Sequence, residues 1–503
     1  MRLYYLLLTA FIEGAAVMCV ELCSAKMLAP FFGTSIYVWA AVLGVTLSAL
    51  MTGYYTGGYL SFKYRTTKTV YYIMGTAAIY MMLIPSIIKV IIPATINLSI
   101  IPGSLISLIF ILFIPLVLFG TISPLLINLI NTDKHTSGKS SGTIYAVSTL
   151  GGIIATFLIG FYLLPHYGIS FCLILFGIIV GLPAVLYFFV KKQYGLLVIL
   201  VVTNSILGYR FMHAKIAKNI LYKSDGILGE IKVIDRSLYN QKTNTYTPFR
   251  ELMVNNISQT VMDLNNPNNS YWDYVDVLIY NLNNYAKGKK VLLLGLGGGT
   301  LYKQLKQNGY DIDVVEIDER IAKVAKDFFQ VEKDLNVVID DARHYLNTTN
   351  KKYDVIIYDL FNSETPPTHL MTLEAFKELK TKLTDKGLLV INFYGFISGD
   401  KGLAARSLYK TLLSNQFDIR LFSTPGSEAS RNLLFYCGKS LLGKAKNEIV
   451  HNLIYEVDLD LTKAPILIDN KPVLEHIYVE AALSWRKGYN KINTKYFIER
   501  DIY

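Results

Sequence analysis

The chain has 503 residues, of which 52% are hydrophobic and 17% charged, and its mean hydropathy is positive, a composition that excludes an ordinary soluble enzyme. The length is sufficient for two large units. The formal net charge is +11, but the lysines of the C-terminal half are scattered and form no basic stripe interleaved with aromatic residues. We therefore expect anionic lipid headgroups, and no nucleic acid, beside this positive charge.

Residues 1–212 predict a transmembrane domain of about seven helices. Apolar runs with few charges follow one another here, most of them near the roughly 20 residues that a helix needs to cross a bilayer core. The runs cover residues 4–20, 37–60, 70–88, 104–130, 142–165, 168–190 and 194–209. The first six predict full crossings, whereas the last, YGLLVILVVTNSILGY, is short.

Two carboxylates, Glu13 and Glu21, lie in or next to the first apolar run. A charged group inside a span is costly, so these residues point to a path for substrate or protons. A structural interpretation stays open: Glu21 lies near a helix end, where it can reach water, and Glu13 can be protonated or paired with a neighbouring helix. Repeated small residues, as in STLGGIIATFLIG, predict close helix packing.

Residues 220–285 predict a small β-rich subdomain, and residues 286–503 predict an α/β Rossmann-like domain of the class I methyltransferase type. Short alternating segments such as EIKVIDRS and RELMVNN are typical of strands, and SYWDYVDVLIYNLNNYA is typical of a helix. Further along, THLMTLEAFKELKTKLTDKG predicts a helix that ends at Gly387, followed by LLVINFY as the fifth strand of a doubly wound sheet.

A glycine-rich turn follows the first buried strand of this second domain and precedes a helical pattern. Without a Cβ atom, glycine lets the backbone turn sharply and approach a ligand. Glu316 stands near the end of the next strand, about 20 residues further on, where a carboxylate can accept from both hydroxyls of a ribose. The combination predicts a cofactor that contains a nucleoside. The glycines are Gly295, Gly297, Gly298 and Gly299.

Acidic residues end the next two strands as well. Asp340 and Asp341 stand where a loop carboxylate can accept from the exocyclic amine of adenine, and Asp359 ends a fourth strand facing the reaction centre. No lysine followed by serine or threonine succeeds the glycines, so nucleoside triphosphates are disfavoured. Nicotinamide dinucleotide is the rival, but its fingerprint has no counterpart of these later aspartates, which favours an S-adenosyl cofactor.

These motifs resemble the spermidine synthase (polyamine aminopropyltransferase) family, in the form fused to an N-terminal multi-pass membrane domain. The resemblance rests on VLLLGLGGGT, VVEID, DDARHYL and YDVIIYDLFN followed by PPTHLMTLEAF. Upstream, ELMVNNISQT with Gln259 and YWDYVD with Tyr274 and Asp276 resemble the family's strand-rich part. LIDNKPVLEHI resembles the closing segment of the fused forms, and VELCSAKMLAPFFGTSIYVW their first membrane segments.

The resemblance implies a transferase that moves an aminopropyl group from decarboxylated S-adenosylmethionine to an amine such as putrescine. By this resemblance Glu316 holds the ribose, Asp341 the adenine and the Gly295–Gly299 loop the methionine-derived part, and Asp359 accepts the proton. The proton acceptor is needed because the attacking nitrogen sheds a proton. The implied substrate-binding residues are Gln259, Tyr274, Asn362 and Glu364.

Two departures from the family pattern leave the reaction open. Gly298 stands where the family has an aspartate in the glycine loop, and Asn362 stands where it has a second aspartate after the proton acceptor. Glu364 offers a carboxylate that can partly compensate. One alternative is a methyltransferase or related transferase that uses S-adenosylmethionine, and another is a membrane transporter or sensor with a nucleoside-binding domain. His369 is interpreted as structural or gating rather than catalytic.

The side of the membrane follows from the lysines and arginines, which are retained in the cytoplasm. Most of those between the apolar runs fall on the side of Arg2, which places the N-terminus in the cytoplasm. Seven crossings would put the second domain outside, away from its cofactor. We therefore expect the seventh run to lie on the surface or re-enter, and the catalytic domain of this cell-membrane protein to be cytoplasmic.

The remaining expectations concern metals and partners. The four cysteines predict neither a disulfide framework nor a zinc site, so no metal is expected. The expected partners are a small-molecule amine and the lipid bilayer, and the resemblance implies a homodimer. The cysteines are Cys19, Cys23, Cys172 and Cys437.

Overall fold

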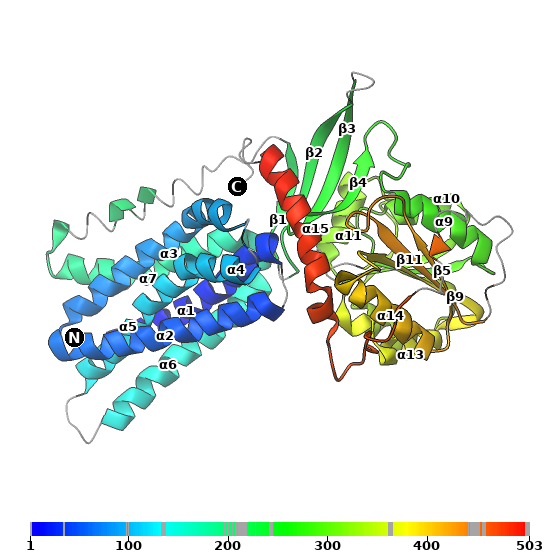
Figure 1. Ribbon diagram of the computed structural model, residues 1–503. Helices are drawn as coiled ribbons and strands as arrows, with labels where there is room; N and C mark the ends of the chain where they lie inside the picture. The colour runs from blue at the N-terminus through cyan, green and yellow to red at the C-terminus, as the bar shows by residue number, and fades with distance from the viewer. Residues whose placement is uncertain are drawn as a thin grey trace. The chain divides into compact units, whose positions relative to one another are not determined.

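The computed structural model contains two compact units (Figure 1). The first unit is helical and comprises residues 1–217, 224–230 and 500–503, and the second comprises residues 218–223 and 231–499. The structure describes all residues except 1–2, 34–35, 97, 99, 132–136, 196–197, 199–200, 204, 207–208, 210–218, 227, 241–244, 361–365, 441, 443–452, 455–458 and 498–503.

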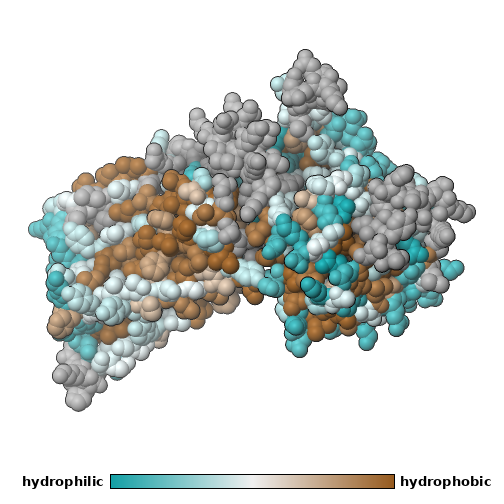
Figure 2. Space-filling model, in the orientation of Figure 1, coloured by the Kyte–Doolittle hydropathy of each residue, from teal (hydrophilic) through white to brown (hydrophobic). Residues whose placement is uncertain are grey.

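Long apolar helices build the first unit. They form because the apolar runs predicted from the sequence are uninterrupted and their backbone polar groups are satisfied within each helix. Large hydrophobic residues such as Leu47, Met51 and Phe161 are exposed, and hydrophobic residues cover much of the visible surface of this unit (Figure 2). The helices are α1 (Leu3–Phe32), α2 (Ile36–Lys63), α3 (Thr67–Thr95), α4 (Ile100–Leu108), η1 (Ile109–Phe113), α5 (Ile114–Ile130), α6 (Ser137–Leu158), η3 (Ile159–Leu163) and α7 (Leu164–Val190).

Five segments of the described residues are long and apolar enough to cross a membrane, and the last of them, Ser137–Val190, contains 54 residues. A straight helix of this length would measure about 80 Å, more than twice the thickness of a bilayer core. The backbone breaks at Gly168, where φ is 80° and ψ is 174°. Beyond the break α7 runs antiparallel to α1. The Cys23 thiol contacts the Ile169 carbonyl (4.0 Å), and the Cys19 thiol, one turn earlier on α1, contacts the Cys172 carbonyl further along α7 (3.8 Å). The segment therefore consists of two helices. Seven of the sixteen residues of the short run 194–209 lie outside the described residues.

The second unit contains two sheets. A four-stranded sheet has the order β1-β2-β3-β4, and an eight-stranded sheet has the order β12-β10-β11-β9-β8-β5-β6-β7. The small sheet consists of β1 (Ile220–Ser224), β2 (Ile231–Asn240), β3 (Thr245–Val254) and β4 (Ile257–Asp263). The large sheet consists of β5 (Lys290–Leu294), β6 (Asp311–Glu316), β7 (Val337–Ile339), β8 (Tyr353–Tyr358), β9 (Leu383–Tyr394), β10 (Asp418–Ser423), β11 (Asn432–Gly438) and β12 (Leu453–Ile454).

Both faces of the large sheet are buried under helices. Along β5, Val291 and Leu293 join one apolar cluster while Leu292 and Leu294 join the other, as the alternation of a strand requires. The first cluster includes α9 (Asp273–Tyr285), α10 (Thr300–Gln307) and α11 (Glu319–Phe328). The second includes α12 (Ala342–Thr348), α13 (Leu373–Lys380), α14 (Leu403–Ser414) and α15 (Leu474–Phe497). The short helices η4 (Thr368–Leu370) and η5 (Asp400–Gly402) complete the unit.

The predicted fold class is confirmed: a helical domain precedes an α/β domain that has a small antiparallel sheet before it. Strands β7, β6, β5, β8 and β9 are parallel. The chain passes from β5 to β6 and β7 and then returns to place β8 on the other side of β5. A ligand site is therefore expected where β5 and β8 end, at the point where the strand order reverses.

One predicted boundary is wrong. The helix expected to reach Gly387 ends at Lys380, and β9 already begins at Leu383. The chain enters the sheet early because the Tyr353 amide donates to the Lys382 carbonyl (2.9 Å) and Leu383 is fully buried. These are contacts to a distant strand, which the local helical pattern does not contain.

The close packing of α1 against α6 gives a testable prediction. A Cβ atom at Gly151 would collide with the Phe11 carbonyl, whereas one at Gly142 of the same helix would meet nothing. Gly151→Ala should destabilise the helical unit by about 1–3 kcal/mol through overpacking. Gly142→Ala should be neutral or stabilise it by up to about 1 kcal/mol, because alanine favours helix. Thermal unfolding of the purified protein in detergent measures both, and equal midpoints for the two variants would contradict the prediction.

Candidate active site

The glycine-rich turn joins β5 to α10 at the point where the strand order reverses. Gly295, Gly297 and Gly299 have φ values of 91°, 53° and 77°, in the region that favours glycine. A Cβ atom at Gly295 would also collide with the carbonyl oxygen of Asp359, which follows β8. The amide of Asp359 in turn donates to the Leu294 carbonyl (3.0 Å). The glycine loop and the end of β8 are therefore held in direct contact.

Asp359 is half-buried, and its carboxylate has a partner on each oxygen. The Tyr274 hydroxyl donates to its Oδ2 (3.0 Å), and the Asn392 Nδ2 donates to its Oδ1 (2.8 Å). Burial raises the pKa of Asp359 above its ordinary value, although the two hydrogen bonds oppose the shift. Burial and the charge of Asp359 also raise the pKa of Tyr274, so its phenol stays protonated and donates. This arrangement gives a fixed carboxylate that is more basic than an exposed one.

Two asparagines behind Asp359 were not predicted. Asn392 lies on β9 and is 4% exposed, and its Oδ1 accepts from the Nδ2 of Asn432 on β11 (2.8 Å). The amide of Asn432 donates to Thr424 Oγ1 (2.8 Å). Because the side-chain oxygen of Asn392 is engaged, its NH₂ group is directed at Asp359. A polar residue within the apolar strand LLVINFY is the signal that could have revealed it.

Glu316 ends β6 beside the glycine loop. Its Oε2 accepts from the Leu296 amide (2.9 Å) and its Oε1 from the Asp318 amide (3.0 Å). Burial raises the pKa of Glu316, while these backbone hydrogen bonds oppose the shift. The carboxylate thus fixes the turn and lies at the edge where the strands end, and each oxygen keeps a further lone pair that a hydroxyl group could use. Its role in holding a ribose stays a prediction.

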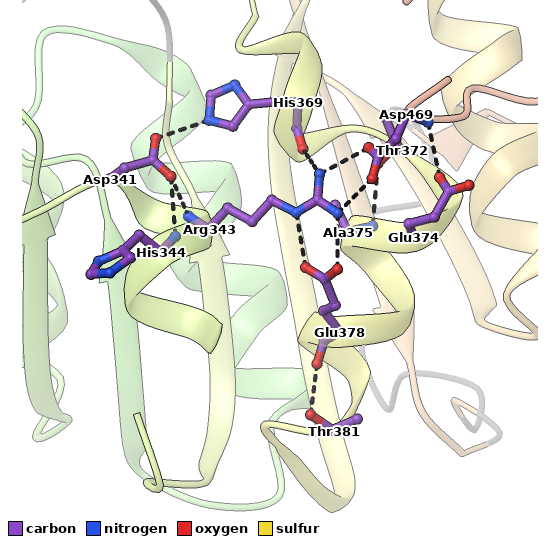
Figure 3. A network of polar contacts seen from close by, with 10 residues as sticks. All are labelled: Asp341, Arg343, His344, His369, Thr372, Glu374, Ala375, Glu378, Thr381 and Asp469. Carbon is purple, nitrogen blue, oxygen red and sulfur yellow. Dashed lines mark hydrogen bonds and ion pairs between the residues drawn. The ribbon is translucent and has the colours of Figure 1, made fainter. Parts of the chain in front are cut away.

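Asp341 follows β7 and caps helix α12 (Figure 3). Its Oδ1 accepts from the amides of Arg343 (2.9 Å) and His344 (3.1 Å), and its Oδ2 bonds to Nε2 of His369 (2.9 Å). Partial burial raises the pKa of Asp341, but the hydrogen bonds from His369 and from these amides outweigh burial and lower it. Asp340 bonds instead to Nδ1 of His344 (2.8 Å). No described contact joins the side chains of Asp341 and Glu316, so the adenine role of Asp341 stays a prediction.

Arg343 holds the segments around His369 together, and the sequence did not reveal it (Figure 3). Its guanidinium forms two hydrogen bonds to Glu378 (2.8 and 2.9 Å) and two to Asp469 (2.8 and 2.7 Å). Its Nη1 also donates to the His369 carbonyl (3.0 Å), and Thr372 donates to Asp469 (2.7 Å). These contacts hold the LIDNKP segment next to His369. Arg343 binds the backbone carbonyl of His369, and the His369 imidazole bonds to Asp341.

The predicted substrate-binding residues are only partly described. Tyr274 reaches Asp359, but Gln259 bonds through Nε2 to the Ile257 carbonyl within its own sheet (3.4 Å). Asp276 is exposed on α9. Asn362 and Glu364 lie outside the described residues.

Thr260 of β4 fills the space next to Gly298. The Gly298 amide donates to Thr260 Oγ1 (2.8 Å). A Cβ atom at Gly298 would lie 2.7 Å from Thr260 Cγ2 and 3.0 Å from Phe329 Cδ1. The loop therefore has no room for an aspartate at the position where the resemblance would place one. This coupling between Thr260 and Gly298 was not predicted from the sequence.

Comparison with known proteins finds one matching family and several relatives of the C-terminal half. Residues 277–393 match the family described as Spermine/spermidine synthase domain. A polyamine aminopropyltransferase of Vibrio vulnificus is 34% identical over 131 residues, which are 25% of this chain and 44% of that protein. An N-terminal histidine N-methyltransferase of Emericella nidulans is 33% identical over 142 residues, 27% of this chain and 24% of that protein. The chain thus spans less than half the length of these relatives.

A solved structure of a spermidine synthase from Thermotoga maritima is similar with a TM-score of 0.35 and 17% identity, over 53% of this chain and 88% of that one. The family match itself covers β5 to β9 and includes Glu316, Asp341 and Asp359. The C-terminal half of the chain therefore contains a spermine/spermidine synthase domain, which five long apolar segments precede among the described residues.

Proposed function

We propose that the protein is a membrane-bound transferase that moves an aminopropyl group from decarboxylated S-adenosylmethionine to an amine such as putrescine. The observation that carries this proposal is Asp359, a half-buried residue whose carboxylate is held by Tyr274 and Asn392 and whose backbone carbonyl packs against Gly295 of the glycine loop. The family match and the similarity to an aminopropyltransferase support the same reaction class.

The chemistry needs few groups. The lone pair of the amine nitrogen forms a bond to the propyl carbon next to the sulfonium, and the carbon–sulfur bond breaks with its electrons going to sulfur. The nitrogen sheds a proton, which Asp359 accepts. Because Tyr274 and Asn392 hold both oxygens of Asp359, the base is oriented before the amine arrives. An acceptor that arrives as an ammonium ion is attracted by the carboxylate, and it gives its proton to Asp359 before its lone pair can attack.

The donor site is proposed along the ends of β5, β6 and β7. Glu316 would accept from the ribose hydroxyls, Asp341 from the adenine amine, and the glycine loop would face the methionine-derived part. The carboxylates lie next to these strand ends in the structure, in a region of the fold suited to a nucleoside. Gln259, Tyr274, Asn362 and Glu364 remain the proposed residues of the acceptor side.

A second candidate, a transferase that uses intact S-adenosylmethionine, is favoured by the glycine loop. Thr260 occupies the space beside Gly298, so no carboxylate stands there to pair with the ammonium of an aminopropyl chain. One relative is described as a histidine N-methyltransferase. The two candidates differ in the donor that the site prefers.

We also propose a cytoplasmic catalytic domain at the cell membrane. The five candidate spans, the last of which is two helices, give six crossings between Leu3 and Val190. An even number returns the chain at Val190 to the side on which it began, which the lysine and arginine distribution makes the cytoplasm, and the run 194–209 is proposed to add no crossing. The division into a transmembrane domain (1–212), a β-rich subdomain (220–285) and a Rossmann-like domain (286–503) is part of this proposal, as is a homodimer.

Donor preference separates the two candidate reactions. Isothermal titration of the purified protein with decarboxylated and with intact S-adenosylmethionine should show tighter binding of the decarboxylated form. Mass spectrometry of the products with putrescine should then show an added aminopropyl group. Tighter binding of the intact form, with methylated product, would replace the first candidate by the second.

Replacement of the proposed base should abolish most of the activity. Asp359→Asn is expected to lower kcat by about 10²–10⁴-fold, the usual contribution of a positioned base. Since its pKa is raised in the folded state, ionised Asp359 costs folding stability at neutral pH, so the variant should unfold at the same temperature or higher. Asp354→Asn, at the opposite end of β8, is the control. Wild-type turnover by Asp359→Asn would contradict its role.

The pH dependence of kcat/KM should change when a hydrogen bond to Asp359 is removed. The value of kcat/KM should fall with decreasing pH as Asp359 is protonated, at a higher pH than for an ordinary aspartate. The Tyr274 hydroxyl favours the ionised form, so Tyr274→Phe should raise the pKa of Asp359 and move this limb to higher pH. The control is Tyr310→Phe. The Tyr310 hydroxyl donates to Asn283, so its removal should leave the pH profile unchanged. A shift toward lower pH in Tyr274→Phe would refute this coupling.

A further inference from the structure

The helical unit contains a buried carboxylate that the proposed reaction does not use. Glu13 of α1 is 2% exposed, and its Oε2 accepts from Ser148 Oγ of α6 (2.8 Å) and Ser123 Oγ of α5 (3.3 Å). Among the residues that the structure describes, no hydrogen bond reaches its Oε1 and no cationic side chain pairs with it. The two hydroxyl donors stabilise the ionised form of Glu13, but no positive charge among the described residues balances its negative charge.

Tyrosine rings lie one helical turn from the serine that bonds to this carboxylate. Tyr145 precedes Ser148 by three residues on α6, so the two side chains share one face of the helix. The Tyr54 ring meets the Tyr145 ring of α6 edge to face, with centroids 6.3 Å apart. Both tyrosines are exposed, at 39% and 42%, so these rings lie between the buried Glu13 region and the surface of the helical unit.

These groups match one kind of ligand. A carboxylate inside a membrane span is costly without a partner, and such residues mark ligand paths when no protein cation balances them. An ammonium group supplies the missing charge and three N–H donors, which Oε1 and the remaining lone pairs of the serine oxygens can accept. An aromatic face next to the carboxylate further stabilises an organic cation. No group of three or more histidine, cysteine or acidic side chains suited to a metal ion occurs among the described residues.

We propose that the Glu13 carboxylate and the Tyr54 ring bind the ammonium group of an alkylamine inside the helical unit. The choice of an amine rests on the proposed function, in which an amine is the acceptor. The site itself is built by α1, α2, α5 and α6 and contains none of the residues assigned to the transfer reaction. The helical unit thereby has a role in handling the amine and does not serve as an anchor alone.

Carbodiimide labelling tests this site in the full-length protein in lipid nanodiscs. Dicyclohexylcarbodiimide attaches to carboxyl groups in apolar surroundings, and peptide mass spectrometry locates the adduct. Putrescine at ten times its half-protecting concentration should lower labelling of Glu13 about tenfold, as mass action requires. Glu21, on the same helix and without such serine partners among the described residues, is the internal control and should be labelled equally with and without putrescine.

Three outcomes would overturn the proposal: unchanged labelling of Glu13, equal loss of label at Glu21, or equal protection by sodium chloride, which would indicate an inorganic cation. The aromatic contribution is tested by Tyr54→Leu, which should raise the half-protecting concentration roughly two- to thirty-fold. Tyr55→Leu, next to it and 81% exposed, should not. Equal effects of the two variants would remove the ring from the site.

The same preparation distinguishes the two proposals. Product formation from decarboxylated S-adenosylmethionine and putrescine is measured alongside the labelling. Protection of Glu13 without any aminopropyl product would refute the proposed reaction and support the amine site. Product formation without protection of Glu13 would refute the amine site alone.

Discussion

The junction between β5 and β8 is the constraint on which the rest of the catalytic unit depends. Gly295 and the Asp359 carbonyl are so close that no side chain fits between them, and this contact brings the cofactor loop and the proposed base to one point. The parallel order of the strands makes the contact possible, because β8 lies directly beside β5. The Leu296 amide of the glycine loop donates to Glu316, which ends β6, so β6 is joined to the same loop. The candidate site is thus formed by the ends of β5, β6 and β8 together.

Carboxylates in the two units are stabilised in different ways. Asp359 is held by a phenol and an amide, which keep it in place without neutralising it, so it can still accept a proton. Asp341 is held by a histidine and by helix amides and is therefore the more acidic group. Glu13 has hydroxyl partners and no described cation. The hydrogen-bond partners of each carboxylate, more than its position in a motif, determine how readily it takes up a proton.

The fold was largely predictable because its signals are local. Apolar runs of membrane length, short buried strands and a glycine turn are each read from neighbouring residues. The contact of Tyr274 with Asp359 could be anticipated only through the family resemblance, because 85 positions separate the two residues. Asn392, Arg343 and Asp469 were missed since their importance arises from pairing across the fold: Arg343 and Asp469 lie 126 positions apart. The end of α13 was misplaced for the same reason, because Leu383 is drawn into the sheet by Tyr353.

The packing of Thr260 against Gly298 has a consequence for how such loops diverge. An acidic side chain at position 298 would collide with Thr260 and Phe329, so one substitution cannot recreate the aspartate-containing loop that the resemblance leads one to expect. Residue 260 would have to become smaller first: serine would remove the colliding Cγ2 and keep the hydroxyl that accepts from the Gly298 amide, whereas alanine would remove both. The order of the two substitutions therefore matters for natural divergence and for protein engineering alike, because an acidic residue at 298 fits only after the change at 260.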